Sequence, residues 1–366
     1  MQNTKIEKRR FLPRYAIVLY AIAALALVVY LVAVISPAFA NWFQYYIGGA
    51  VRFLSAHLTA WLPISLAELL VLASPLMIIC VAVYAWHRHC ESWGDMLRYL
   101  LSVISVVSLL FSLFVFSFGT GHHTDPLDQR LGLHAEEVSV EELRATALLL
   151  AAKVNAAATE VTFGEDGFSE RPYDLDTLNR HLIAAYDSVC AQYEFISSLS
   201  VGVKPVLASK AMSYTHITGV YTYFTGEANV NTYFPDYTVP FTAAHEMAHQ
   251  RGIARENEAN FVAFLATDAS NDPYVRYAGY LNLYEYVANA LWSADRDAYT
   301  EVLETLSPEV IGELRAYAKF FEQFKDSVAA DISDAVNDTY LKVHGNAAGS
   351  ASYGLVVDLA IAYYKQ

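Results

Sequence analysis

Residues 241–252, FTAAHEMAHQRG, carry the side chains of this chain that are best suited to chemistry. His245 and His249 are four residues apart, so on a helix both rings share one face and can reach one metal ion. Glu246 projects beside them, where a carboxylate can take a proton from a metal-bound water. The spacing predicts a zinc-binding helix. The simpler alternative is a solvated helix with two incidental histidines.

A third protein ligand is needed, because catalytic zinc usually binds three and keeps its fourth position for water. Gly252 allows a sharp turn, and a second helix is expected to begin at about Arg255. Glu256 and Asn260 share a face of that helix, while Glu258 lies about 200° round it from Glu256. Both carboxylates therefore remain open as the third ligand. The one that does not bind metal is expected to be a surface carboxylate near a helix N-terminus.

His-Glu-x-x-His followed by Glu-x-x-x-(Asp/Asn) on the next helix resembles the gluzincin zinc metallopeptidases. The resemblance implies that Glu256 is the third zinc ligand and that Asn260 holds a zinc-binding histidine through a hydrogen bond. Two features depart from that pattern: Glu256 follows His249 by only seven residues, and Asn260 stands where Asp is commoner. Nearly the whole chain also resembles an uncharacterised bacterial family of three-span membrane proteins, through the runs AHEMAHQRG and ARENEANF. That second resemblance implies no substrate.

A short β element is expected just before the histidine helix. Residues 217–234 are rich in β-branched and aromatic side chains around Thr225-Gly226, which predicts a hairpin. Asn229 and Asn231 alternate with apolar residues and would share one sheet face. The gluzincin resemblance implies an edge strand here that pairs with an extended peptide substrate; a hairpin that only supports the helix is the alternative. Weaker candidates for stabilising an oxyanion are Tyr214, His216, Tyr221 and Tyr223.

Three apolar segments fill the first third of the chain, at residues 15–36, about 66–86 and 99–117. Each has roughly the 20 residues that a membrane-spanning helix needs. The first is longer than the apolar region of a signal peptide and is interpreted as an uncleaved anchor. Glu68, near the outer end of the second segment, is expected to reach headgroup water.

The distribution of basic residues predicts how these segments are oriented. Five basic residues precede the first segment, two lie between the second and third, and only Arg52 lies between the first and second. The positive-inside rule therefore predicts a cytoplasmic N-terminus, with everything after residue 118 on the outer face. Four aromatic residues suit an interfacial belt in the outer loop: Trp42, Tyr45, Tyr46 and Trp61.

Composition limits the class of protein. The chain is 55% hydrophobic and only 17% charged, against about 25% in soluble chains. Of its 24 basic and 38 acidic residues, 8 and 4 lie before residue 119, which leaves the rest with a net charge of −18. Such an acidic surface argues against nucleic acid as a partner. Three scattered cysteines exclude a disulfide scaffold.

The remaining periodicity is mostly helical. A capping box at Ser139 begins a helix, and further apolar patterns predict helices at 174–196, 240–251, 255–269, 273–292, 295–305, 308–335 and 352–364. The predicted fold is a membrane section of three helices followed by a mainly α (α+β) zincin-like domain. Its predicted parts are a basic tail at 1–14, the spans at 15–118 and an extracytoplasmic domain at 119–366.

Two functions fit this sequence. One is a zinc-dependent peptidase, anchored in the cell membrane, that hydrolyses a peptide or protein substrate outside the bilayer. In it Glu246 is the general base, and His245, His249 and Glu256 hold Zn²⁺. The other is a membrane protein without enzymatic activity, in which zinc has a structural or sensing role.

Overall fold

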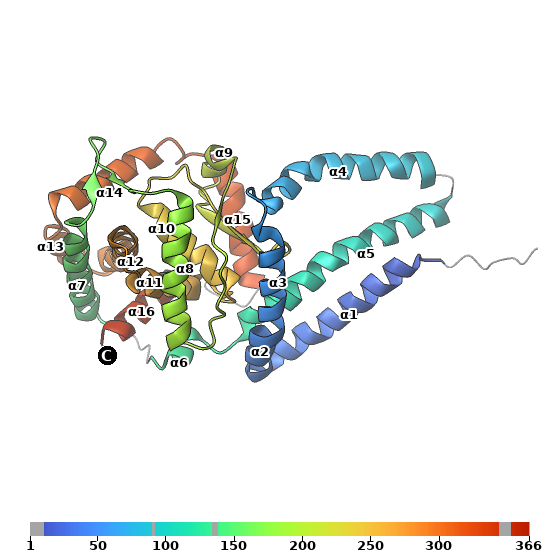
Figure 1. Cartoon of the computed structure of the whole chain (residues 1–366), viewed down its shortest axis with the longest axis horizontal. Coiled ribbons are helices and arrows are strands. Elements are labelled where there is room, and N and C mark those ends of the chain that lie inside the picture. Colours follow the sequence, from blue (N-terminus) through green and yellow to red (C-terminus); the bar gives the residue numbers. More distant parts are fainter. Residues whose placement is uncertain (1–10, 90–91, 134–137, 344–352, 366) are drawn as a thin grey trace, which may run out of the picture.

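The computed structural model describes residues 11–89, 92–133, 138–343 and 353–365. As predicted, the fold is mainly helical, with three long apolar helices near the N-terminus and small β-sheets (Figure 1). The apolar helices are α1 (Arg14–Ile35), α4 (Leu66–His89) and α5 (Trp93–Ser117). All three are long and apolar enough to cross a membrane, and they project together from the body of the protein (Figure 1).

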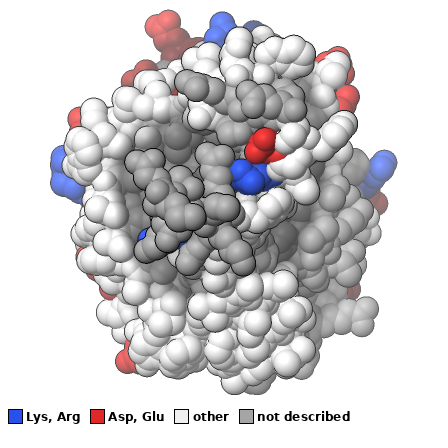
Figure 2. Space-filling model, turned by 90° about the vertical axis from the view of Figure 1, so that its right-hand side faces the viewer, with Lys and Arg blue, Asp and Glu red and all other residues white. Residues whose placement is uncertain are grey.

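Helices α1 and α5 pack along one another because small residues line their contact. Ala16, Ala26 and Ala33 of α1 are fully buried, as are Ser105 and Ser112 of α5, and small side chains let two membrane helices approach closely. Viewed from the end that carries the three helices, the described residues show few charged side chains, most of them at the rim (Figure 2). Both features suit helices that lie in a bilayer.

The connection between the first two spans, the outer loop of the predicted topology, is largely helical. It contains α2 (Pro37–Phe43), a five-residue π-helix η1 (Gln44–Gly48) and α3 (Gly49–Ala60). Ser36 begins α2 by accepting a hydrogen bond from the Phe39 N–H, with Pro37 in the first helical position. The four aromatic residues of the predicted belt are exposed at this end of the spans: Trp42, Tyr45, Tyr46 and Trp61.

The body of the protein is a group of helices around α12 (Pro273–Ala294), whose apolar residues are largely buried. Most predicted helices are present within a few residues of their expected bounds. Besides α12, the helices of the body are η2 (Gly119–His123), α6 (Leu127–Leu131), α7 (Val140–Ala158), α8 (Leu175–Gln192), α9 (Ser209–Ser213), α10 (Thr238–Gln250), α11 (Glu256–Asp268), α13 (Arg296–Leu303), α14 (Pro308–Phe321), α15 (Val328–Val343) and α16 (Tyr353–Tyr364). The capping box of Ser139 and Glu142 forms at α7.

One long predicted helix, 308–335, is divided into α14 and α15. The chain leaves the helix so that Phe324 can be buried, with its ring against Phe320, Phe321 and Tyr214. The Phe324 carbonyl also accepts a hydrogen bond from His216 Nε2 at 2.8 Å. Burial of this aromatic residue explains why the apolar pattern continues where the helix does not.

The main sheet has three strands in the order β3-β5-β4. The predicted hairpin is formed by β4 (Gly219–Thr222) and β5 (Glu227–Val230), while β3 (Lys204–Pro205) adds a parallel strand on the other side of β5. A small second sheet pairs β1 (Thr162–Phe163) with β2 (Ser169–Glu170). The prediction that residues 226–231 form an edge strand is therefore wrong, because β5 is central and β4 is the edge.

Two glutamates join the second span to the body of the protein. Glu227 of β5 accepts the main-chain N–H groups of residues 66–67 at 3.0 and 2.8 Å, and it pairs with Lys204 at 2.7 Å. A carboxylate at a helix N-terminus satisfies unpaired N–H groups and the helix dipole. Glu68 accepts the N–H groups of residues 207–208, so it binds the body of the protein through these bonds, where the sequence predicted contact with headgroup water.

Candidate metal centre

Helix α10 carries both histidines and Glu246 into the interior. It packs against the sheet on one side and against α11 and α12 on the other. Ala243, Ala244 and Ala248 are fully buried, so their small side chains allow this close packing. His249 is 5% exposed and Glu246 also 5%.

A tight turn brings the next helix back to the same face. Gly252 has φ +104°, a conformation that glycine adopts without strain, and ends α10. A Cβ at this position would lie 2.5 Å from Nη2 of Arg52 in α3. Gln44 of η1 donates to the Gly252 carbonyl at 3.2 Å. The turn that sets the position of Glu256 is therefore braced by the helices between the first two spans.

The buried guanidinium of Arg52 connects this turn to the end of α5. Its Nη1 donates to the Ser117 carbonyl at 2.7 Å and its Nη2 to the Gln44 carbonyl at 3.1 Å. Arg52 is only 1% exposed, and burial lowers its pKa to about 10. Sequence analysis treated Arg52 only as a charge in an outer loop, because partners so distant along the chain leave no local pattern.

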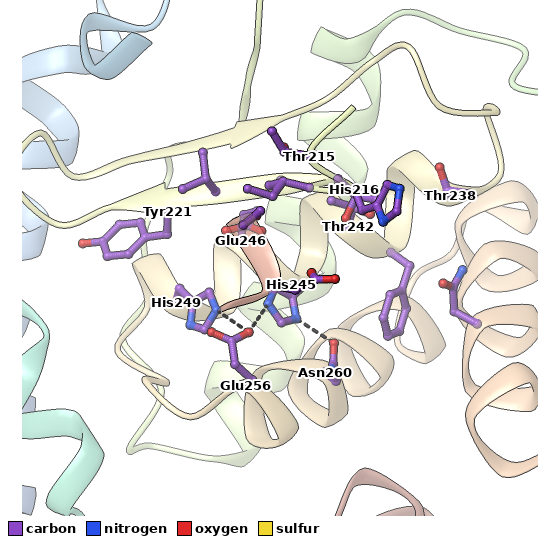
Figure 3. A pocket seen from close by; sticks show the side chains of 18 of the residues that line it. Thr215, His216, Tyr221, Thr238, Thr242, His245, Glu246, His249, Glu256 and Asn260 are labelled. Atoms are coloured by element: carbon purple, nitrogen blue, oxygen red, sulfur yellow. Dashed lines mark hydrogen bonds and ion pairs between the residues drawn. The ribbon is translucent and has the colours of Figure 1, made fainter. Parts of the chain in front are cut away.

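His245, His249 and Glu256 come together as a group that could hold a metal ion (Figure 3). Glu256 Oε2 lies 3.1 Å from His245 Nε2 and 3.4 Å from His249 Nε2, and the three ligand atoms lie within 4.8 Å of one another. Bonds of about 2.05 Å to a tetrahedral zinc ion place ligand atoms about 3.3 Å apart. The donor set and its spacing therefore fit zinc.

Hydrogen bonds on the other side of each ring leave both Nε2 atoms free to bind a metal. His249 Nδ1 lies 2.7 Å from the carbonyl oxygen of Ile253, which can only accept, so Nδ1 must carry the proton. His245 Nδ1 lies 2.7 Å from Asn260 Oδ1 in the same way. A neutral imidazole with hydrogen on Nδ1 presents the Nε2 lone pair, as metal-binding histidines usually do.

The charge of Glu256 dominates the local electrostatics. Burial lowers the pKa of His249, but the neighbouring Glu256 carboxylate outweighs it and raises that pKa to about 9. Burial raises the pKa of Glu256, yet the two histidines together hold it well below its usual range. A carboxylate facing two Nε2 atoms is stable only when a cation, either a proton or a metal, lies between them.

Glu246 lies between the sheet and the histidine pair (Figure 3). Burial raises the pKa of its carboxyl group, and the Tyr221 main-chain N–H hydrogen-bonds it. Gly219 makes this position possible, since a Cβ there would lie 2.7 Å from Glu246 Cγ and Oε1. The edge strand β4 therefore packs directly on the carboxylate that was predicted to act as general base.

Glu258 lies outside the metal-binding group. Its Oε1 accepts from Arg255 Nη1 at 2.6 Å and from the Leu127 N–H at 3.0 Å, so it joins α11 to the start of α6. Its side chain is only 4% exposed, so the expectation of a surface carboxylate is wrong. Glu258 remains near the N-terminus of α11, where negative charge is favoured.

Asn229 and Asn231 form hydrogen bonds within the protein. Asn229 Nδ2 donates to the Val220 carbonyl at 3.1 Å, and Asn231 Nδ2 donates to the Ile217 carbonyl at 3.1 Å. Both residues are 1% exposed, and neither lines the cavity at the metal-binding group. Of the four weaker candidates, His216, Tyr221 and Tyr223 line that cavity, and Tyr214 does not.

A cavity of about 1090 Å³ contains the group. Its lining includes a polar face of α12 that sequence analysis missed: Asn282, Glu285, Tyr286 and Asn289. Polar residues at this helical spacing in an otherwise apolar helix are a signal that could have been found. Another part of the lining comes from α5 and the residue that follows it, and this part is apolar: Val107, Leu110, Phe111, Phe114 and Phe118.

These features define a mainly helical protein with three candidate membrane-spanning helices and a candidate His/His/Glu metal site. Residues 39–361 match the family described as protein of unknown function (DUF3810), and the chain belongs to that family. The prediction that it belongs to an uncharacterised family is thus confirmed. Comparison with curated proteins gives no match, and neither does comparison with solved structures.

Proposed function

We propose that this protein is a membrane-anchored zinc peptidase whose active site lies outside the bilayer. The observation that carries the proposal is the paired orientation of the two histidines. Each Nδ1 is held by an acceptor, and both Nε2 atoms face the Glu256 carboxylate. A bound zinc ion would polarise the scissile carbonyl and lower the pKa of a water toward neutrality.

The other residues of the site supply what such a reaction needs. Glu246 is buried beside the histidines, and its raised pKa suits a group that takes a proton from water and later gives it to the leaving amine. The edge strand β4 offers main-chain groups for an extended peptide, a role that sequence analysis gave to β5. Asn260 orients His245 through its 2.7 Å hydrogen bond.

A structural or sensing zinc site is the alternative function. Structural zinc usually has four protein ligands and no open position. In the described part of this chain three residues form the group, and they border a large cavity. A buried carboxylate that is not part of the group lies next to them. These observations favour an enzyme over a structural site.

The proposed orientation places the N-terminus in the cytoplasm. The α1 N-terminus, where Arg14 lies, the C-terminal end of α4 and the N-terminal end of α5 lie at the end of the spans away from the body (Figure 1). Arg98, near the start of α5, lies at this same end. Basic residues favour the cytoplasmic side, which supports an extracytoplasmic body.

The test compares membranes from cells that make the full chain with membranes from cells that make the Glu246→Gln variant. Protein N-termini are mapped by mass spectrometry. We expect new N-termini that are present with the wild type, absent with Glu246→Gln and lost when a zinc chelator is added. Identical N-termini in all three samples would show that the protein is not a peptidase.

A further inference from the structure

We infer that the substrates are membrane-anchored polypeptides, cut a few residues outside their own membrane-spanning segment. This inference rests on the proposed peptidase function and adds the class of substrate. The observation that carries it is the extent of the cavity: one continuous hollow joins the metal-binding group to the apolar face of a candidate membrane span.

The apolar side of this cavity is a single stripe on α5. Each of its residues lies three or four positions from another, which places them on one helix face: Val107, Leu110, Phe111, Phe114 and, directly after the last residue of the helix, Phe118. From Val107 to Phe118 the stripe extends about 16 Å along the helix axis, or about half of a bilayer core. An occupant of this part of the cavity would therefore lie in the bilayer, against α5.

The stripe reaches the metal-binding group through direct ring contacts. The Phe118 ring lies 5.6 Å from the His249 ring, measured between centroids, and 5.4 Å from the Tyr221 ring. Phe114 lies one helical turn before Phe118 in the chain, and the centroid of its ring lies 5.3 Å from that of the Tyr223 ring. Among the described residues, aromatic rings in contact thus connect the site to the stripe along this wall.

Strand β4 runs along the same path. Its first residue, Gly219, covers Glu246, Tyr221 lies near His249, and Tyr223, just after the strand, meets Phe114. A peptide paired with β4 would travel from the site to the start of the stripe in about four residues, or about 13 Å. In the described residues this edge of β4 pairs with no other strand.

The path favours a polypeptide over a lipid as the occupant. An extended peptide can use the free edge of β4 through main-chain hydrogen bonds, which an acyl chain cannot form. A hydrophobic helix can then cover the exposed apolar side chains of the stripe, of which Val107 is 57% and Leu110 43% exposed. The site and the stripe together therefore fit a chain that changes from extended to membrane-embedded.

The experiment uses the full-length protein, loaded with zinc, in phosphatidylcholine vesicles. One synthetic library has a randomised extended segment followed by a Leu/Ala-rich membrane helix. A second library has the same randomised segment without the helix. Mass spectrometry identifies the cut positions and their rates. We expect the anchored library to be cut at least about ten-fold faster, within a few residues of its helix.

Each outcome decides between the two claims. Equal rates for both libraries, with cuts unrelated to the helix, would refute the anchored-substrate inference and leave the peptidase proposal standing. Absence of any cut by protein that contains zinc would refute the peptidase proposal, and this inference with it. Cutting of the anchored library alone, close to its helix, supports both.

Neighbouring valines of α5 provide a matched pair of variants. Val107 lines the cavity, whereas Val106 does not, and they are 57% and 53% exposed. Val107→Trp should fill the apolar part of the cavity and slow cutting of the anchored library at least about five-fold. Val106→Trp should not slow it. Zinc content should be the same in both variants; equal rates for the two would contradict the proposed path.

Discussion

Removal of the Asn260 side chain should weaken zinc binding without abolishing it. Asn260 Oδ1 accepts from His245 Nδ1 at 2.7 Å, which fixes the ring with Nε2 toward Glu256. Loss of such a partner typically costs 10–100-fold in metal affinity. Asn260 is 6% exposed, so water replaces it poorly, and we expect the upper part of that range for Asn260→Ala. This corresponds to about 2–2.7 kcal/mol.

The assay is competition for zinc between the purified full chain and a chromophoric chelator. Asn257→Ala is the matched control, because Asn257 is a buried residue of the same helix that does not line the cavity. Asn260→Asp should bind zinc at least as tightly as the wild type, because a carboxylate also accepts from Nδ1 and makes the ring more basic. If Asn260→Ala bound zinc as tightly as Asn257→Ala, the hydrogen bond would have no role in orienting the histidine.

Three further predictions concern stability and topology. Glu227→Gln should lower the free energy of unfolding in detergent by about 3 kcal/mol, because it leaves buried Lys204 without its charged partner; a loss below about 1 kcal/mol would show that the pair behaves like a surface one. Burial raises the pKa of Glu285 to about 7. Between about pH 4.5 and 7 the unfolded chain loses this proton while the folded chain keeps it, so the free energy of unfolding of the wild type should fall as the pH rises through this range. Glu285→Gln should therefore raise the melting temperature at about pH 8 but not at about pH 5, and an equal shift at both would refute the assignment. A reporter fused after Gln366 should be extracytoplasmic and one at Gly94 cytoplasmic; the reverse would contradict the proposed orientation.

The geometry of the metal-binding group was accessible from sequence because it depends on local periodicity. A four-residue spacing puts His245 and His249 on one helix face, and the same spacing puts Glu256 and Asn260 on the next. The structure places both pairs face to face, with distances that suit one ion. The short connection around Gly252 is no obstacle, because Glu256 is the first residue of α11 and reaches back to both rings.

Features that depend on distant parts of the chain were not accessible. Alternation correctly placed Asn229 in a strand, whereas Asn231 follows the end of that strand. Strand β5 is central only because the two-residue strand β3 pairs with it from residue 204. Glu258 is held away from the metal-binding group by contacts that include the main chain of Leu127, 131 residues earlier. Arg52 is held by carbonyls of two different elements, α5 and η1, so its charge in sequence indicated only topology.

The most direct test of the central claim is the zinc content of the purified full chain, measured as ions per chain in matched variants. We expect about one ion in the wild type and in Glu246→Gln, because Glu246 is not a ligand. Glu256→Ala should lose the ion, whereas Glu258→Ala should keep it, because Glu258 is bound to Arg255 and Leu127. A wild-type chain without zinc, or a Glu256→Ala chain that still holds one ion, would contradict the account.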